Sequence, residues 1–148
     1  MPKDDTDLEK FTRELQVQIM EKIQKRYTQT VIDHWQNPRH FCKIENPDGY
    51  AKVKGPCGDT MEMFVKTKEG IITECAFQTD GCGTTIVCGS IATELAKDKS
   101  FTQALATVSS DEILAKLGGL PETDVHCASL AAETLRSVIT DCLNQKRS

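Results

Sequence analysis

Three short cysteine-containing blocks constrain the fold of this chain more than any other feature of its sequence. They are Cys57-Gly58-Asp59, Gly81-Cys82-Gly83 and His126-Cys127, and their cysteines lie 25 and then 45 residues apart. Three thiolates and one oxygen or nitrogen ligand make a tetrahedral set that suits zinc, or iron in an iron–sulfur cluster. A common site would require a fold that brings two loops and a distant helix together near the surface.

Asp59 and His126 are alternative fourth ligands. Asp59 follows Cys57 by two residues, so both side chains can converge from one loop, although a turn or helix-cap role explains this aspartate equally well. His126 adjoins Cys127, but neighbours on a helix point about 100° apart, so we do not expect both to bind one metal in the same state. The chain has no Cys-x-x-Cys, which counts against zinc ribbons, thioredoxin-like motifs and ferredoxin spacings.

The other cysteines are sorted by periodicity. Cys88 and Cys142 fall on apolar helical stripes, and Cys75 shares a strand face with Phe77, so we expect these three thiols in the core. Cys42 follows Phe41 in a loop and is expected to be an incidental thiol.

Two of the three block cysteines lie where a helix begins. Cys82 lies between two glycines just before a helical pattern, and Cys127 falls in the first turn of the last helix. Because helix N-termini favour negative charge, we expect low thiol pKa values for both, as a thiolate ligand requires.

Composition narrows the class of protein. With 148 residues the chain is about one domain long, and a net charge of −4 argues against nucleic-acid binding. No apolar run is long enough to span a bilayer, and the acidic N-terminus does not resemble a secretory signal. An odd number of cysteines, seven, also fits a reducing compartment. We therefore expect a cytoplasmic protein without a membrane partner.

Periodicity predicts an α+β fold with a small three-stranded antiparallel sheet packed against helices. Residues 7–26 form an amphipathic helix with an apolar stripe, and residues 28–36 form a short helix with Val31, Ile32 and Trp35 facing inward. Strands are expected at 50–54, 61–68 and 71–79, with a tight hairpin between the last two. In the last strand, strict alternation places Thr73 with the core-facing residues and Ile72 on the opposite face. Helices follow from 83, at 102–108, 110–117 and 125–144. Residues 1–26 are thus a helical extension of a domain spanning 27–148.

The motifs also support a resemblance that covers about four-fifths of the chain. Its residues include Tyr27-x3-Val31-Ile32-Asp33-His34-Trp35-x-Asn37-Pro38-Arg39, Gly55-x-Cys57-Gly58-Asp59, Thr79-x-Gly81-Cys82-Gly83, Ala92-Thr93-Glu94-Leu95, and Leu120-Pro121-x4-His126-Cys127-x2-Leu130-Ala131. In order and spacing they resemble the IscU/NifU N-terminal type of iron–sulfur cluster assembly scaffold.

The resemblance implies a function. Cys57, Cys82 and Cys127 would bind the cluster, with Asp59 and His126 completing or exchanging in the coordination sphere. A transient [2Fe–2S] cluster would be built from Fe²⁺ and from sulfur that a cysteine desulfurase delivers as a persulfide, with Cys127 as the candidate acceptor. The cluster would pass to apo acceptor proteins, and the isolated protein could hold Zn²⁺. The chain would be a scaffold and carrier rather than an enzyme.

The chain departs from the family pattern in three places. The stretch that Hsp70/Hsp40 chaperones recognise in the family, Leu-Pro-Pro-Val-Lys, is Leu120-Pro121-Glu122-Thr123-Asp124 here, which reverses the local charge and argues against dedicated chaperone recognition. The helix over 7–26 extends the usual start, and it could cover the scaffold or pair with another copy to form a homo-oligomer. The 45-residue step between Cys82 and Cys127 lacks the insertion of SufU-type relatives, which favours the IscU/NifU branch.

Two other functions use the same residues. A zinc-binding sulfur-relay protein would hold one metal at the three cysteines and never build a cluster. A cysteine-nucleophile enzyme would pair Cys127 with His126, but adjacent helical residues rarely meet as nucleophile and base, and the other two blocks would have no role.

Overall fold

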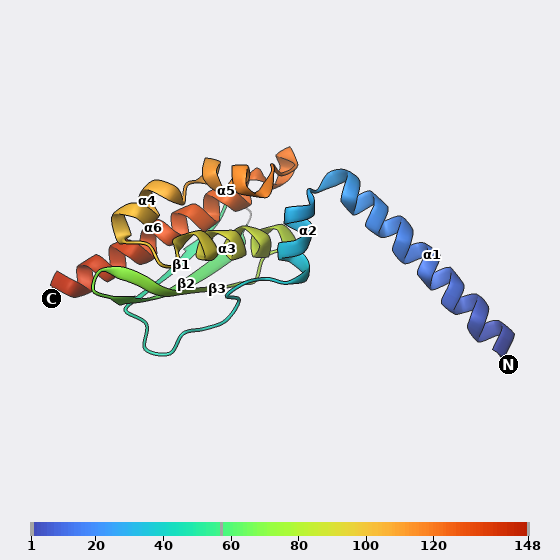
Figure 1. Ribbon diagram of the computed structural model, residues 1–148, viewed down its shortest axis with the longest axis horizontal. Coiled ribbons are helices and arrows are strands. Elements are labelled where there is room, and N and C mark those ends of the chain that lie inside the picture. The colour runs from blue at the N-terminus through green and yellow to red at the C-terminus, as the bar shows by residue number, and fades with distance from the viewer. Residues whose placement is uncertain (1, 57, 148) are drawn as a thin grey trace.

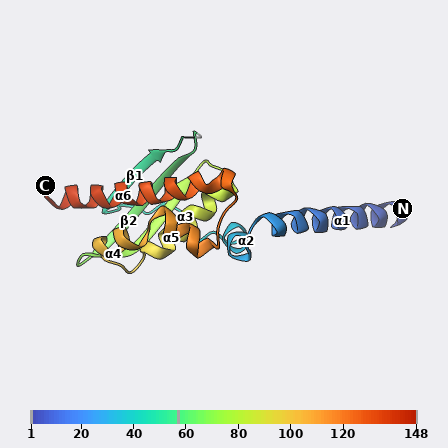
Figure 2. The ribbon, with the colours of Figure 1, turned by 90° about the horizontal axis from the view of Figure 1, so that it is seen from above.

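The computed structural model describes residues 2–56 and 58–147, with side chains for 7–56 and 58–145, and it has the expected α+β architecture. In Figures 1 and 2, helices α3, α4, α5 and α6 lie over one side of the sheet, while α1 projects away from the body. In chain order the elements are α1 (Pro2–Arg26), α2 (Gln29–Gln36), β1 (Gly49–Lys54), β2 (Thr60–Lys68), β3 (Ile71–Thr79), α3 (Gly83–Ala96), α4 (Phe101–Thr107), α5 (Ser110–Leu117), the 3-10 helix η1 (Glu122–Asp124) and α6 (Val125–Arg147).

The three strands form one antiparallel sheet in the order β1-β2-β3, as the sequence predicted. Strands β2 and β3 are joined by Glu69 and Gly70, whose positive φ angles of 54° and 79° are those of a type I′ hairpin turn. This pairing sets the start of β2 beside the end of β3. The loops that carry Asp59 and Cys82 therefore leave the sheet at the same end.

A β-bulge changes which residues of β3 face the core. The register shifts between Lys66 and Thr67, where Lys66 pairs with Glu74 and Thr67 pairs with Ile72, leaving Thr73 as the extra residue. Ile72 therefore joins the core face and is fully buried. The alternation expected from the sequence, with Ile72 on the opposite face, is wrong because the extra residue reverses the faces beyond it.

The core lies between the sheet and the helices α3 and α6. Cys75, Cys88 and Cys142 are buried in it, as expected, and Cys42 is exposed. Helix α3 packs very closely on the sheet, because a Cβ atom at Gly89 would lie 2.5 Å from the ring of Phe77.

Helix α2 packs beside α3 through Val31, Ile32 and His34, all of which are buried. The Nδ1 atom of His34 lies 2.8 Å from the Ser90 hydroxyl. The expectation for Trp35 is wrong, since this side chain is 46% exposed. Its indole lies over the first turn of α3, where a Cβ at Gly83 would come within 2.7 Å of Nε1.

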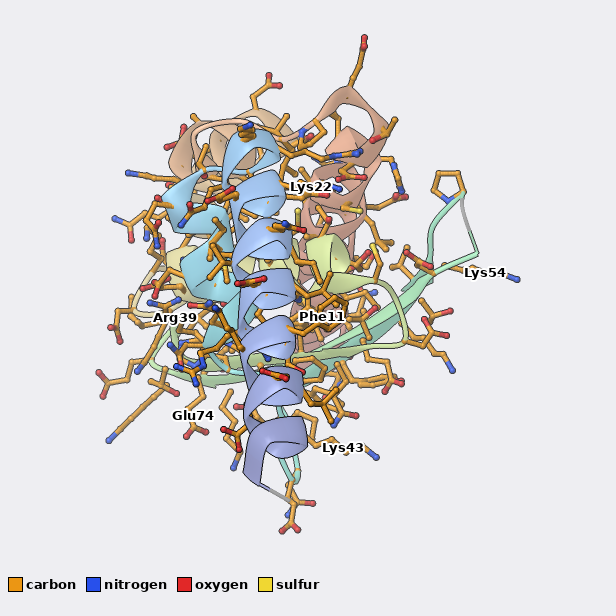
Figure 3. All side chains as sticks on the ribbon, turned by 90° about the vertical axis from the view of Figure 1, so that its right-hand side faces the viewer. Phe11, Lys22, Arg39, Lys43, Lys54 and Glu74 are labelled. Atoms are coloured by element: carbon orange, nitrogen blue, oxygen red, sulfur yellow. The ribbon has the colours of Figure 1, made fainter. Side chains whose placement is uncertain are left out.

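Helix α1 begins at Pro2, before the expected start at residue 7, and proline is a residue that suits the first turn of a helix. Figure 3 looks along this helix from its free end, with Phe11 in its N-terminal half and Lys22 nearer the body both labelled. The predicted apolar stripe exists, but Leu8 is 65% exposed and Phe11 62% exposed. Among the described residues, every helix is too short or too polar to cross a membrane.

Candidate metal centre

The described members of the three cysteine blocks meet at one end of the molecule. Asp59 lies in the loop that leads into β2, Cys82 is the residue that caps the start of α3, and His126 and Cys127 stand in the first turn of α6. The structure thus brings together four of the five predicted ligands from three separate parts of the chain. The fifth, Cys57, lies outside the described residues.

A threonine that the sequence analysis did not select connects these side chains. The hydroxyl of Thr85, which is fully buried, donates a hydrogen bond of 3.1 Å to Asp59 Oδ2. The same oxygen lies 3.4 Å from Cys127 Sγ and 3.6 Å from Cys82 Sγ. A hydroxyl has one proton and two lone pairs, so while it donates to Asp59 it can accept from both thiols in their protonated form, and it can turn to donate to a sulfur that ionises. The sequence offered one clue to this role: Thr85 lies three residues after Cys82, the N-cap position, and a side chain at that position can face the cap.

Gly81 is needed for this arrangement. A Cβ at this position would come within 2.8 Å of the Thr85 side chain and 2.9 Å of Asp59 Oδ2. Because separations this short are not tolerated, any side chain at Gly81 would push the threonine and the carboxylate apart. The glycine before Cys82 therefore serves the close approach of two neighbouring side chains.

His126 lies closer to Cys127 than helical geometry alone suggested. Its Nε2 atom is 3.7 Å from Cys127 Sγ, so the imidazole lies beside this sulfur. Both fourth-ligand candidates thus remain beside the thiols, Asp59 through Thr85 and His126 directly. His34 is buried between α2 and α3.

The two described cysteines of the site have opposite acidities. Partial burial opposes ionisation of Cys82, but the backbone N–H and hydroxyl of Thr85 and the N–H of Thr84 outweigh it and lower the pKa of this exposed thiol. Cys82 makes no side-chain capping hydrogen bond, so these amides act on it as the positive end of α3. The prediction of a low pKa is confirmed for Cys82.

The same prediction is wrong for Cys127. Burial, together with the negative groups at Cys82, Asp124 and Asp59, raises its pKa to about 11, and the Thr85 hydroxyl offsets only part of this shift. Only 1% of the residue is exposed. Its place in the first turn of α6 does not compensate for the loss of solvent.

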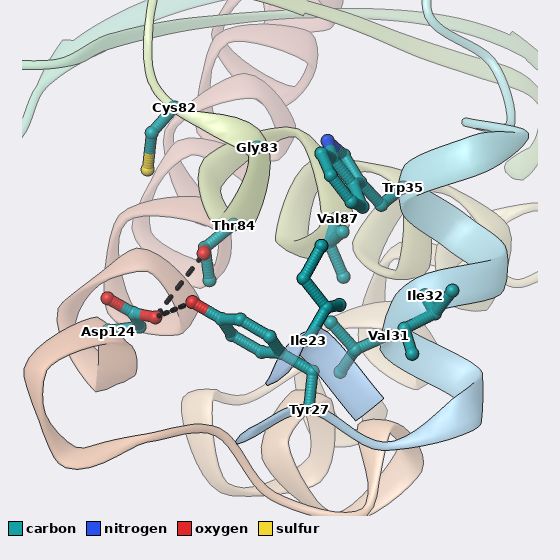
Figure 4. Close-up of a pocket in the computed structure, with 10 residues that line it drawn as sticks. All are labelled: Ile23, Tyr27, Val31, Ile32, Trp35, Cys82, Gly83, Thr84, Val87 and Asp124. Carbon is teal, nitrogen blue, oxygen red and sulfur yellow. Dashed lines mark hydrogen bonds between the residues drawn. The ribbon is translucent and has the colours of Figure 1, made fainter. Parts of the chain in front are cut away.

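A largely apolar cavity of about 310 Å³ adjoins Cys82. Figure 4 shows its lining, in which Tyr27 and Trp35 stand opposite Cys82 and Ile23 enters from α1. The Tyr27 hydroxyl donates a hydrogen bond of 2.9 Å to Asp124, which also accepts from Thr84 at 3.4 Å.

The stretch 120–124 is held in place by the end of α1. In addition to the Tyr27–Asp124 bond, Arg26 donates to the Thr123 hydroxyl at 3.0 Å. Burial and the hydrogen bond to Asp124 raise the pKa of Tyr27, so the phenol stays protonated and keeps donating. Two residues that depart from the family's chaperone-recognition stretch are therefore engaged within the chain.

The donor set fits a transition metal or an iron–sulfur cluster. Asp59, Cys82, His126 and Cys127 offer a carboxylate, two thiols and an imidazole, which together suit iron or zinc. As they stand in the described ranges, no three histidine, cysteine, aspartate or glutamate side chains are close enough to hold a metal ion. Thr85 occupies the centre of the group, so its contacts have to break before the ligands converge.

Comparisons with known proteins agree with this chemistry. The iron–sulfur cluster assembly scaffold protein IscU 1 of Archaeoglobus fulgidus is 45% identical over 78% of this chain and 75% of its own length. The scaffold protein IscU of Escherichia coli K12 is 36% identical over 82% of this chain and 98% of its own. The crystal structure of a SUF-system scaffold protein from Fervidobacterium islandicum has a TM-score of 0.63 at 19% identity, covering 76% of this chain and 96% of that one. At that identity the structural match shows the fold alone.

The NifU-like N terminal domain family matches residues 26–148. This range includes the sheet, every helix from α2 to α6 and all three cysteine blocks, and it leaves out almost all of α1. The chain is also similar in sequence to the IscU scaffold proteins of Archaeoglobus fulgidus and Escherichia coli. It belongs to the NifU-like N-terminal domain family.

Proposed function

We propose that this chain is a scaffold on which a [2Fe–2S] cluster is assembled transiently and then passed to apo acceptor proteins. The observation that carries the proposal is the meeting of Asp59, Cys82 and Cys127, from three parts of the chain, around the single hydroxyl of Thr85. The cluster is the cargo, and the protein is a carrier rather than an enzyme. The role of its relatives as iron–sulfur cluster assembly scaffold proteins supports this proposal.

The ligands divide into three soft groups and one exchangeable group. Each iron of a [2Fe–2S] cluster needs two protein ligands besides its bridging sulfides. Cys57, Cys82 and Cys127 supply three thiolates, and either Asp59 or His126 supplies the fourth position. A harder and weaker ligand there gives the cluster a point at which a bond can open during transfer.

A cysteine desulfurase is the proposed sulfur donor, and Cys127 the proposed acceptor. The acceptor thiolate attacks the outer sulfur of the donor's persulfide, a new S–S bond forms, and the donor's cysteine leaves as a thiolate. Cys127 is buried and has a pKa of about 11, so the start of α6 has to open before this step. Cys82 is already exposed with a lowered pKa, and it is the thiol that can bind Fe²⁺ first.

Cluster formation also needs electrons. Reducing persulfide sulfur to sulfide takes more electrons than two ferrous ions give on becoming ferric, so an external reductant supplies the remainder. In the absence of iron, Zn²⁺ is expected to bind the same thiolates in the isolated protein.

We infer that dedicated Hsp70/Hsp40 recognition through residues 120–124 does not operate here. The stretch is acidic where the family has a lysine, and its Thr123 and Asp124 side chains bind Arg26 and Tyr27. A partner that gripped this stretch would have to break both contacts.

The test is anaerobic reconstitution with Fe²⁺, cysteine, a reductant and a cysteine desulfurase, followed by absorbance spectra and metal and sulfide analysis. We expect visible bands with equal iron and sulfide, lost in Cys57→Ser, Cys82→Ser or Cys127→Ser and kept in Cys42→Ser, which changes an exposed cysteine outside the site. A colourless protein that holds zinc but accepts persulfide sulfur would refute the scaffold in favour of a sulfur relay.

A further inference from the structure

Helix α1 carries an apolar stripe that nothing in the described structure covers. Leu8, Phe11, Leu15 and Ile19 are spaced three or four residues apart, so they share one face, and between 46% and 65% of each is exposed. Apart from its last turn, which joins the body, the helix projects away from it (Figures 1 and 2). An apolar face of this length on an isolated helix is typical of a helix that packs against another helix.

We propose that α1 pairs in antiparallel orientation with α1 of a second copy of this chain. The charges on the helix support this partner. Over residues 7–14 acidic side chains outnumber basic ones, with Asp7, Glu9 and Glu14 against Lys10 and Arg13. Over residues 19–26 the balance is reversed, with Lys22, Lys25 and Arg26 against Glu21. An antiparallel pair places the acidic half of each helix beside the basic half of the other, whereas a parallel pair places like beside like.

The flanks of the stripe agree with this orientation. Asp7 and Lys25 are 18 residues apart, about five helical turns, so they lie on the same side of the stripe. In a two-fold antiparallel pair centred near Leu15, Asp7 of one copy lies level with Lys25 of the other, and the arrangement is repeated by symmetry. Two equivalent salt bridges therefore frame the apolar contact.

The pairing also reaches the candidate cluster site. The stripe ends at Ile23, which lines the cavity beside Cys82 (Figure 4). In the antiparallel register Leu8 of the second copy lies level with Ile23. Its N-terminal end therefore rests against the cavity mouth, near Trp35, and each copy helps to close the site of the other.

The expected association is weak and reversible, because a single helix pair lies at the low end of interface sizes. Sedimentation of the full chain over a concentration series measures it without metal or cluster, so its failure leaves the proposed function untouched. Leu15→Glu should weaken dimerisation by more than about tenfold, since it places a charge at the centre of the pair. Val17→Glu makes the same kind of change at a residue that is 55% exposed on the opposite face, and it should leave the dimer intact.

Charge reversal tests the orientation. Asp7→Lys and Lys25→Asp should each weaken the dimer, and the double variant should restore it, because the pair is re-formed across the interface. Trp35 is the only tryptophan, so its emission reports on the cavity and should shift on dimerisation in the wild type but not in Leu15→Glu.

Several outcomes would overturn the proposal. These are a wild-type chain that stays monomeric, a dimer that Leu15→Glu and Val17→Glu affect alike, a double charge reversal that fails to restore association, or a dimer that leaves the emission of Trp35 unchanged. A monomer that binds anionic lipid vesicles through Leu15 would assign the stripe to a membrane surface and would equally refute it.

Discussion

Replacing Thr85 by valine tests whether one hydroxyl holds the site together before metal binds. The substitution keeps the shape of the side chain and removes its donor to Asp59 and its contacts with two sulfurs. A hydrogen bond to a charged group contributes about 1.5–3 kcal/mol, and the added methyl group in a fully buried position offsets part of this loss. We therefore expect the free energy of unfolding of the apo-protein to fall by about 1–2 kcal/mol, which lowers its Tm by roughly 2–8 °C in a chain of this size.

In the cluster-loaded protein, Thr85→Val should lower the Tm by less than it does in the apo-protein. Once the cysteines and the carboxylate bind iron, their bonds to Thr85 have already been given up, so the valine removes little from that state. The difference in Tm between apo- and cluster-loaded protein should therefore widen in Thr85→Val. Anaerobic calorimetry or circular dichroism on both forms measures this difference, and Thr85→Ser, which keeps the hydroxyl, should behave like the wild type in this respect.

Thr134→Val is the matched control. Thr134 is also a fully buried threonine, but its hydroxyl donates to the Leu130 carbonyl at 2.7 Å within α6. Its removal should lower the Tm of both forms equally. The reasoning would be refuted by a Thr85→Val apo-protein with unchanged Tm, or by equal losses in its apo and loaded forms.

Other predictions follow from the same structure. Asp59→Ala should slow transfer of the cluster to an apo acceptor several-fold, because a weak exchangeable ligand is lost. Absorbance spectra follow the transfer, and a rate equal to that of the wild type would contradict this prediction. In the apo-protein iodoacetamide should modify Cys82 first near neutral pH, and Cys127 only as the pH rises toward its pKa of about 11, as read by peptide mass spectrometry; modification of both at equal rates would show that burial does not control their acidity. Gly89→Ala should lower stability to urea by about 1–3 kcal/mol although alanine favours helices, since its Cβ would strike the ring of Phe77; an unchanged midpoint would mean that α3 can move off the sheet.

Much of the fold was predictable because it is encoded locally. Helix α5 (Ser110–Leu117) and strand β3 (Ile71–Thr79) have the predicted bounds, since their apolar periodicity ends at clear turn residues. The hairpin turn was predictable as well, because Gly70 supplies a positive φ at no steric cost. The proximity of Asp59, Cys82 and Cys127 was inferred from their residue types rather than from local structure.

The missed features all depend on tertiary partners. The bulge at Thr73 reflects how β3 pairs with β2. The indole of Trp35 lies over the first turn of α3 at Gly83, where it remains partly exposed. Thr85 looks like an ordinary helical threonine until the fold brings Asp59 and Cys127 to it. Periodicity indicates which face a residue occupies, but not what stands opposite that face.

The unequal acidity of Cys82 and Cys127 gives loading an order. Both cysteines are near the start of a helix, so the dipole alone would make them alike; burial separates them, leaving one exposed thiol with a lowered pKa and one buried thiol with a raised pKa. A metal ion should bind first at Cys82, because its proton leaves more easily. Its positive charge then favours ionisation of Cys127 nearby, and the Thr85 hydroxyl favours the same ionised form. A site loaded in this sequence needs an opening of α6 to accept sulfur and can close again once the cargo has left, which suits a carrier better than a permanent metal site.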